Sequence, residues 1–386
     1  MNHHSSFSSR RTERVRTRRL LVGMMATFAM VLGNFGGGAA TAAADTVIDT
    51  IPVGTSPTGV AITPDGTRAY VANTFGSTVS VIDTGTNTEI MTVPVGPGPL
   101  GVAITPNGTR AYVANTFGST VSVIDTGTNT EITTIMVGAN PVGVAITPDG
   151  TRAYVTNFGA NTVSVIDTGT NTEITTVPVG IQPQGVAITP DGTRAYVANN
   201  VGSTMSVIDT GTNMVVATVN VGNGPQGVAI TPDGTRSYVT NFGANTVSVI
   251  DTGTNTVVGG PIIVGTDPRR VAITPDGTRA YVTNEGNSTV SVIDTGTNTV
   301  VETVTVENRP FGVAITPNGS RAYVANFGDD SVSVIAIDRC LGSLCFGSLA
   351  GAGSLVGGGS TGSGGTGSLA GTGSLVGAGS AGSAGS

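Results

Sequence analysis

The stretch GVAITPDGTRAYVANTFGSTVSVIDTGTNTEIMTVPVG, residues 59–96, recurs along most of this chain and decides its fold. Its phrase Val-Ala-Ile-Thr-Pro occurs seven times, and successive prolines are 42 residues apart except for one spacing of 43. The seven tyrosines of the chain all share one repeat position: Tyr70, Tyr112, Tyr154, Tyr196, Tyr238, Tyr281 and Tyr323. So strict a period predicts a repeat architecture in place of the two or three ordinary domains that 386 residues could form.

Each repeat contains four short runs of β-forming residues. In the first repeat they span residues 59–63, 69–72, 78–82 and 88–95. The sequences between them, Pro64-Asp65-Gly66-Thr67 and Asp83-Thr84-Gly85-Thr86-Asn87, carry the Pro, Gly and Asx residues of tight hairpin turns. Four antiparallel strands per repeat predict one blade of a β-propeller.

The order of the strands within a blade follows from their side chains. The first run, Gly-Val-Ala-Ile-Thr, has the small residues that seven strands need around a common axis. The last run contains Pro52, Pro94, Pro178 and Pro261, and proline is confined to sheet edges or bulges because it cannot donate to the ladder. The last run is therefore the outer strand, and the extra residue of the 43 spacing, within 258–261, is expected to form a bulge.

The two ends of the repeat region complement each other. Residues 46–54 are an outer strand with no blade before it, and residues 312–338 are a blade with no outer strand after it. Joining them completes seven blades and removes unpaired strand edges that would invite aggregation. The sequence therefore predicts an all-β fold: a seven-bladed β-propeller of four-stranded antiparallel blades over residues 45–338, closed by the N-terminal strand.

The Tyr-Val-Thr-Asn and Tyr-Val-Ala-Asn units, together with Thr-Pro-Asp-Gly and Val-Ile-Asp-Thr, resemble the YVTN family of β-propeller repeats. The resemblance covers about three quarters of the chain. It implies the propeller fold and a place among exported bacterial or archaeal surface-layer proteins. It implies little about activity, because one fold hosts many functions.

The segments outside the repeats predict export and attachment. Residues 1–44 resemble a signal peptide, with an Arg-rich start, a short apolar run and small residues before a cleavage site at Asp45. Arg18 and Arg19 would suit a twin-arginine signal, and the Sec route fits equally well. Residues 339–386 form a Cys-containing junction and a Gly- and Ser-rich tail, predicted to be a disordered tether or an envelope contact. Cys340 and Cys345 are expected to pair in an exported protein, with an intermolecular disulfide as the alternative.

Composition excludes several kinds of site and partner. The chain has no Lys, and its histidines, His3 and His4, lie in the predicted signal peptide. A Ser-His-Asp triad, a Cys-His pair, a Schiff-base lysine and a His-ligated metal are therefore excluded from the mature chain. After residue 44, eleven arginines face twenty-three acidic residues, so we expect no nucleic-acid partner. We also expect no cofactor and no transmembrane segment in the mature protein, and we expect a monomer.

Two charged positions recur in the repeats, and each has a structural and a functional interpretation. The first is an acid in the turn before the outer strand, at Asp83, Asp125, Asp167, Asp209, Asp251 and Asp294. We interpret it as an Asx-type turn in preference to a calcium loop, because it lacks the paired acids and closing Glu of such loops. The second is Arg68 and its equivalents, interpreted as pairing with a neighbouring acid in preference to forming a ring of anion sites.

A binding site is expected where the repeat breaks down. The connections from second to third strand and from fourth to first strand share one face of a propeller, and most of the variation lies there. The variable positions are mostly apolar: Thr58, Leu100, Val142, Gln184, Gln226, Arg269 and Phe311 in one loop, Phe75, Phe117, Phe158, Val201, Phe242, Glu285 and Phe327 in the other. The least regular residues predict a binding patch: Asp267, Arg269, Arg270, Glu285, Arg309 and Phe311. Drift in solvent-exposed loops is the alternative.

Three functional classes remain open. The leading hypothesis is a secreted or cell-surface, non-enzymatic scaffold that binds a protein or glycan of the cell envelope through its loop face. The second is a cofactor-dependent or hydrolytic propeller enzyme of the quinoprotein or lactonase type. The third is a purely structural component of the cell wall.

Overall fold

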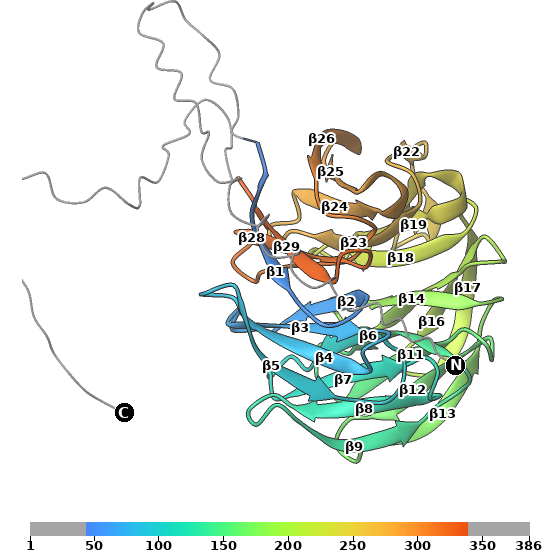
Figure 1. Ribbon diagram of the computed structural model, residues 1–386. Helices are drawn as coiled ribbons and strands as arrows, with labels where there is room; N and C mark the ends of the chain where they lie inside the picture. Colours follow the sequence, from blue (N-terminus) through green and yellow to red (C-terminus); the bar gives the residue numbers. More distant parts are fainter. Residues whose placement is uncertain (1–43, 339–386) are drawn as a thin grey trace, which may run out of the picture. The chain divides into compact units, whose positions relative to one another are not determined.

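The computed structural model describes residues 44–338, which form seven antiparallel sheets arranged as the blades of a β-propeller; six have four strands, and in the remaining one the fourth strand is divided in two. The blades follow one another around the ring in chain order (Figure 1). Residues 1–43 of the signal peptide predicted over 1–44, the pairing of Cys340 with Cys345 and the tail to residue 386 lie outside the described residues. No helix within 44–338 is long and apolar enough to cross a bilayer.

Corresponding strands have the same length in every blade, except that the outer strand of blade 5 is divided into two short strands. Blade 1 contains β2 (Pro57–Ile62), β3 (Arg68–Asn73), β4 (Thr78–Asp83) and β5 (Thr88–Pro94). Blade 2 contains β6 (Pro99–Ile104), β7 (Arg110–Asn115), β8 (Thr120–Asp125) and β9 (Thr130–Met136). Blade 3 contains β10 (Pro141–Ile146), β11 (Arg152–Asn157), β12 (Thr162–Asp167) and β13 (Thr172–Pro178). Blade 4 contains β14 (Pro183–Ile188), β15 (Arg194–Asn199), β16 (Thr204–Asp209) and β17 (Met214–Asn220). Blade 5 contains β18 (Pro225–Ile230), β19 (Arg236–Asn241), β20 (Thr246–Asp251), β21 (Thr256–Val257) and β22 (Ile262–Ile263). Blade 6 contains β23 (Pro268–Ile273), β24 (Arg279–Asn284), β25 (Thr289–Asp294) and β26 (Thr299–Thr305). Blade 7 contains β27 (Pro310–Ile315), β28 (Arg321–Asn326), β29 (Ser331–Ala336) and β1 (Thr46–Pro52).

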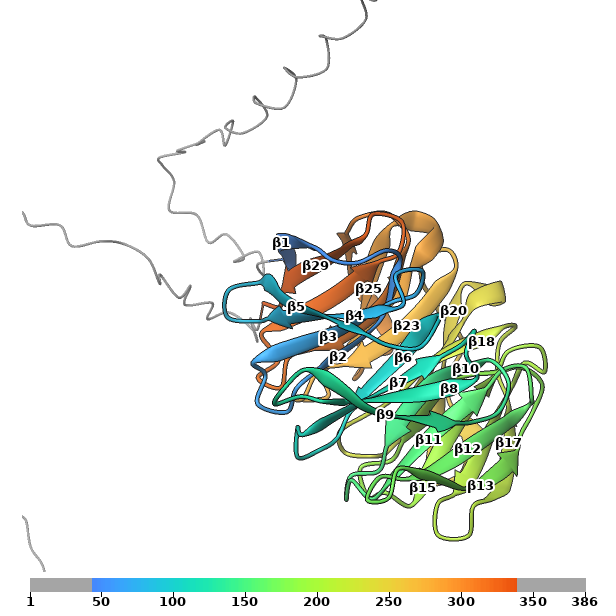
Figure 2. The same cartoon turned by 60° about the horizontal axis from the view of Figure 1, so that its bottom comes forward.

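The closure of the ring is confirmed. β1 pairs with β29 in antiparallel register, from Thr46 opposite Ala336 to Pro52 opposite Ser331. In Figures 1 and 2 the blue N-terminal strand lies beside the orange-red strands of the last blade. The N-terminal strand therefore supplies the outer strand that blade 7 lacks.

The outer strand of blade 5 confirms the predicted irregularity. It is divided into β21 and β22, which both pair with β20 on either side of an interruption that contains Gly259 and Gly260. An alanine Cβ at Gly260 would meet nothing within 4 Å. The extra residue of the 43 spacing is therefore accommodated at the open edge of the sheet, where it disturbs no packed neighbour.

The hydrophobic core lies between blades. The core cluster around Tyr70, for example, combines Val79 and Val81 of blade 1 with Val113 and Ile124 of blade 2. All seven tyrosines are completely buried at such boundaries. Apolar side chains on both faces of each sheet thus hold neighbouring blades together, which explains why the repeat is so rich in valine.

Each tyrosine hydroxyl also donates a hydrogen bond to a residue of the next blade. The Tyr70 hydroxyl donates to Oδ1 of Asn129 at 2.6 Å, and Nη1 of Arg68 donates to the Thr126 carbonyl oxygen at 2.7 Å. The expectation that the repeated arginines pair with a neighbouring acid is wrong for Arg68, whereas the equivalent Arg279 does pair with Asp45, at 3.4 Å. The partner of Arg68 is the Thr126 carbonyl oxygen, because the turn of blade 2 that contains Thr126 packs against the end of blade 1.

The acid of that turn serves the turn itself. Oδ1 of Asp83 accepts hydrogen bonds from the backbone N of Thr86 at 2.8 Å and from its hydroxyl at 3.0 Å. These bonds hold the pKa of Asp83 below its ordinary value. Asn87 then takes a left-handed backbone conformation, with φ 53°. The Asx-type interpretation is therefore confirmed, and within residues 44–338 no group of three or more His, Cys, Asp or Glu side chains is placed to hold a metal ion.

Candidate binding face

An aromatic strip runs across the loop face. We use this name for Phe117, Phe75, Phe327 and Phe311, which come from three successive blades. The ring centroids are 6.5 Å apart for Phe117 and Phe75, 6.0 Å for Phe75 and Phe327, and 6.4 Å for Phe327 and Phe311. Phe75 and Phe117 are 63% and 61% exposed. These are aromatic contact distances, so four rings form one connected apolar surface that solvent reaches.

The variable loop positions, which were expected to form an apolar ring on the loop face, are only partly exposed to solvent. Thr58, Val142 and Gln226, which follow the loop proline in their blades, are buried. The Thr58 hydroxyl, for example, lies 3.0 Å from that of Thr74 and 3.2 Å from the Leu100 carbonyl oxygen of the next blade. Such positions seal the contact between blades, and the exposed apolar surface belongs mainly to the loop between the second and third strands.

Three of the predicted patch residues form one ion-paired cluster. Glu285 lies in a 3-10 turn, η2 (Glu285–Asn287), and Arg269 lies in β23. Each oxygen of the nearly buried Glu285 carboxylate serves one guanidinium: Arg269 pairs with Oε2, and Nε of Arg309 donates to Oε1 at 2.8 Å. Two cations around one acid leave this cluster with a formal charge of +1 in an acidic protein.

The cluster continues into the aromatic surface through cation–π contacts. The Arg269 guanidinium lies 4.3 Å from the ring centroid of Phe242, and the Arg309 guanidinium lies 4.7 Å from that of Phe327. Stacking on a ring and pairing with a carboxylate together restrict the rotamers of both arginines. The predicted residues Arg269, Glu285, Arg309 and Phe311 are therefore brought together, while the positive charges remain next to the aromatic strip.

Asp267 acts through its backbone. It takes φ 56°, its backbone N donates to Oδ1 of Asn245 at 2.9 Å, and its carbonyl oxygen accepts from the backbone N of Glu285 at 3.1 Å. This last bond joins the loop before β23 to η2. Asp267 thus positions the cluster, and it is not among the ion pairs found in the described part of the chain.

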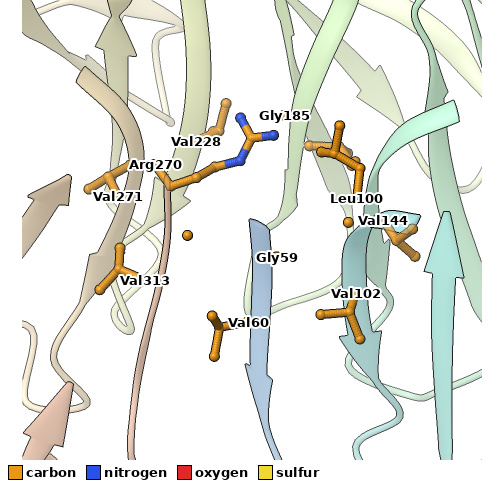
Figure 3. Close-up of a pocket in the computed structure, with 14 residues that line it drawn as sticks. Gly59, Val60, Leu100, Val102, Val144, Gly185, Val228, Arg270, Val271 and Val313 are labelled. Carbon is orange, nitrogen blue, oxygen red and sulfur yellow. The ribbon is translucent and has the colours of Figure 1, made fainter. Parts of the chain in front are cut away.

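Arg270 extends into the centre of the ring, where its guanidinium lies 5.2 Å from the ring centroid of Phe311, which the Arg269 guanidinium also contacts. It lines a cavity of about 140 Å³ whose other walls are glycines, a leucine and the valines of the inner strands (Figure 3). The sequence signal for this placement was available but missed. Six of the seven inner strands begin Pro-x-Gly-Val-Ala-Ile, where x varies. In β23 the glycine of this pattern is replaced by Arg270.

Comparison with known proteins supports the fold. A profile of the family described as lactonase, seven-bladed β-propeller, matches residues 84–213 and 222–350. The chain belongs to this family. A solved structure of hydrazine synthase from Kuenenia stuttgartiensis is similar, with a TM-score of 0.69 and 26% sequence identity over 73% of this chain and 96% of that chain. No curated protein matches the sequence.

The cavity of this lactonase-family propeller offers little for hydrolysis. Arg270 is the one ionisable side chain among the described residues that line it. Opening a lactone requires a base that activates water or a nucleophile, and a guanidinium that keeps its proton is neither. Glu285 on the loop face is a carboxylate, but two arginines occupy its oxygens.

Proposed function

We propose that this lactonase-family propeller is an exported, non-enzymatic binding protein that recognises a protein of the cell envelope through its loop face. The observation that carries the proposal is the aromatic strip with the guanidinium of Arg309 stacked on Phe327, one of its rings. Aromatic residues and arginine are enriched at the centres of protein interfaces, where they provide most of the binding energy. Singly scattered apolar residues would need no such explanation.

The fixed geometry of the strip supports recognition. Arg269 and Arg309 are already held by Glu285 and by aromatic rings, so binding would cost little side-chain entropy. The cluster is positive while the chain as a whole has a formal charge of −7. A partner with acidic groups around an apolar centre would match this surface.

Export supports the same proposal. The Arg-rich, apolar and small-residue sequence of 1–44, the YVTN-type repeats and the Gly- and Ser-rich tail all favour a secreted or surface-associated protein. A protein partner is preferred to a glycan because the strip consists of phenylalanines, which lack the hydroxyl or indole N–H that would donate to a sugar.

The test measures retention of the purified full-length protein on envelope fractions of its source organism. Replacing Phe75 and Phe117 with Ser removes two exposed rings, and each interface anchor contributes about 2 kcal/mol or more. We therefore expect retention to fall more than tenfold. The matched control replaces Ile90 and Ile132 with Ser, which removes two exposed apolar side chains from the outer strands of the same two blades.

Three results would contradict the proposal. Equal loss in the Phe and Ile variants would show that general apolar adhesion causes retention. Unchanged retention in the Phe variant would exclude the aromatic strip. Loss of retention after glycosidase treatment of the envelope, but not after protease treatment, would replace the protein partner with a glycan.

A lactone hydrolase is the second candidate, favoured by the family to which the chain belongs. Incubating the purified protein with a panel of aliphatic and sugar lactones and titrating the released acid distinguishes the two functions. Turnover that disappears in an Arg270→Gly variant would establish an enzyme. We expect no release above the uncatalysed rate.

A further inference from the structure

Arg270 occupies a position where the repeat excludes side chains. In the other six inner strands this position is glycine, and a Cβ there would lie between 2.0 Å and 2.7 Å from a backbone carbonyl oxygen of the next blade. Such distances are well below van der Waals contact. One blade has nevertheless acquired a long charged side chain at the point nearest the axis. Loop drift does not explain this, because the position is in a strand.

The guanidinium of Arg270 has an unused hydrogen-bond donor inside the protein. Its Nη1 is shielded from solvent and has no hydrogen-bond partner among the described residues. Burial, and then the charge of the neighbouring Arg269, lower the pKa of Arg270 to about 10, so the group still carries its proton at neutral pH. No acid lines the cavity in the described chain. Arg270 as a whole is half-buried and its guanidinium contacts the Phe311 ring, but its shielded Nη1 has no counter-ion, and an anion in the cavity would supply one.

The walls of the cavity restrict the kind of anion. In Figure 3 the Arg270 guanidinium extends toward Gly185 and Leu100 in the upper part of the view, while Val60, Val102 and Val313, which line the same cavity, lie below it. The cavity is open to solvent on one side, and its volume of about 140 Å³ is close to the roughly 150 Å³ that accommodates a molecule the size of benzene. One charged fork and an apolar wall match a molecule with one charged end and an apolar body.

We propose that the central cavity binds a small monocarboxylate with an apolar body, such as a short-chain fatty acid or an aromatic acid, through Arg270. A carboxylate accepts two parallel hydrogen bonds from a guanidinium, and the remainder of the ligand packs against the valines. Inorganic phosphate matches less well, because it has no apolar body to pack against the valine side chains of the lining.

The experiment is isothermal titration of the full-length protein with sodium benzoate and with sodium butyrate at constant ionic strength. The decisive variant is Arg270→Gly, which restores the residue of the six other blades and is therefore expected to fold. We expect its affinity for both acids to fall at least tenfold. Arg309→Ala is the matched control, since it removes a guanidinium from the loop face and leaves the cavity unchanged.

Each alternative result overturns the assignment. Equal binding by wild type and Arg270→Gly would place the acids elsewhere. Equal binding of benzyl alcohol and benzoate would show that no charge is recognised. Binding of inorganic phosphate or chloride with no binding of either acid would show a general anion site. Loss of binding in Arg309→Ala with Arg270→Gly unaffected would assign the acids to the loop face.

Discussion

Replacing Asp45 with Ala should open the ring at its closure. Asp45 is only 4% exposed, and its carboxylate accepts hydrogen bonds from the Tyr281 hydroxyl, from Nη1 of Arg279 at 3.4 Å and from the backbone N of Asp338 at 2.8 Å. In an uninterrupted blade boundary the equivalent tyrosine donates to a turn asparagine. Asp45 therefore replaces a turn that the split blade does not have.

The size of the effect follows from these contacts. A hydrogen bond to a charged group contributes about 1.5–3 kcal/mol, and removing one partner leaves the other buried and unsatisfied. Because the Arg279 contact is long and partly exposed, we count it as weak. We therefore expect Asp45→Ala to lower the free energy of unfolding by about 3–5 kcal/mol.

Urea unfolding of the full-length protein, followed by circular dichroism, measures this loss. Asp45→Asn keeps an acceptor for Tyr281 and should lose about 1–2 kcal/mol. Asn129→Ala removes the acceptor of the Tyr70 hydroxyl at a boundary where both blades are continuous in sequence. We expect it to lose about 1–2 kcal/mol, as Asp45→Asn does. If Asp45→Ala unfolds at the same urea concentration as Asn129→Ala, the closure does not depend on Asp45 and the reasoning is refuted.

Three further outcomes are expected. Burial raises the pKa of all seven tyrosines. The stability that the neutral tyrosines contribute is therefore complete below their unfolded pKa of about 10. Above that pH it falls, by up to about 1.4 kcal/mol per tyrosine at pH 11. Tyrosine ionisation that precedes the loss of circular dichroism would contradict this. Gly185→Ala should lose about 1–3 kcal/mol in urea unfolding because its Cβ would lie 2.4 Å from the Gln226 carbonyl oxygen, whereas Gly260→Ala should be neutral; equal effects would refute the crowding argument. Glu285→Ala should lose about 1–2 kcal/mol, because the partly exposed arginines repel each other, and added salt should restore part of it; a loss insensitive to salt would contradict the electrostatic cause.

The fold could be predicted almost completely because its determinants are local and repeated. Pro64, Gly66 and Asn87 specify turns within a few residues of themselves, and the 42-residue period then repeats them. Closure could be predicted because residues 46–54 are an outer strand without a blade and the last repeat is a blade without an outer strand. The partner of Arg68 could not be predicted, because a carbonyl oxygen of the next blade belongs to no recognisable motif.

The candidate site was predictable in location and only partly in arrangement. Breaks in the repeat identified Arg269, Glu285 and Arg309 before their ion pairs were visible. Strand alternation starts Arg269 and Arg270 on different faces of β23, but the sequence could not predict that both guanidinium groups reach the Phe311 ring. Burial of Thr58 depends on how closely two blades approach, a distance that side-chain packing sets and a single repeat does not encode.

The antiparallel pairing of β1 with β29 also determines how the ring responds to mechanical load. Thr46 lies opposite Ala336, so the first residue of one strand and the last of the other are neighbours at the same end of the pair. A force that pulls these two residues apart loads the ladder hydrogen bonds one after another, as in opening a zipper. Tension between the two flanking segments would therefore detach β1 and open blade 7 while the other six blades still carry no load.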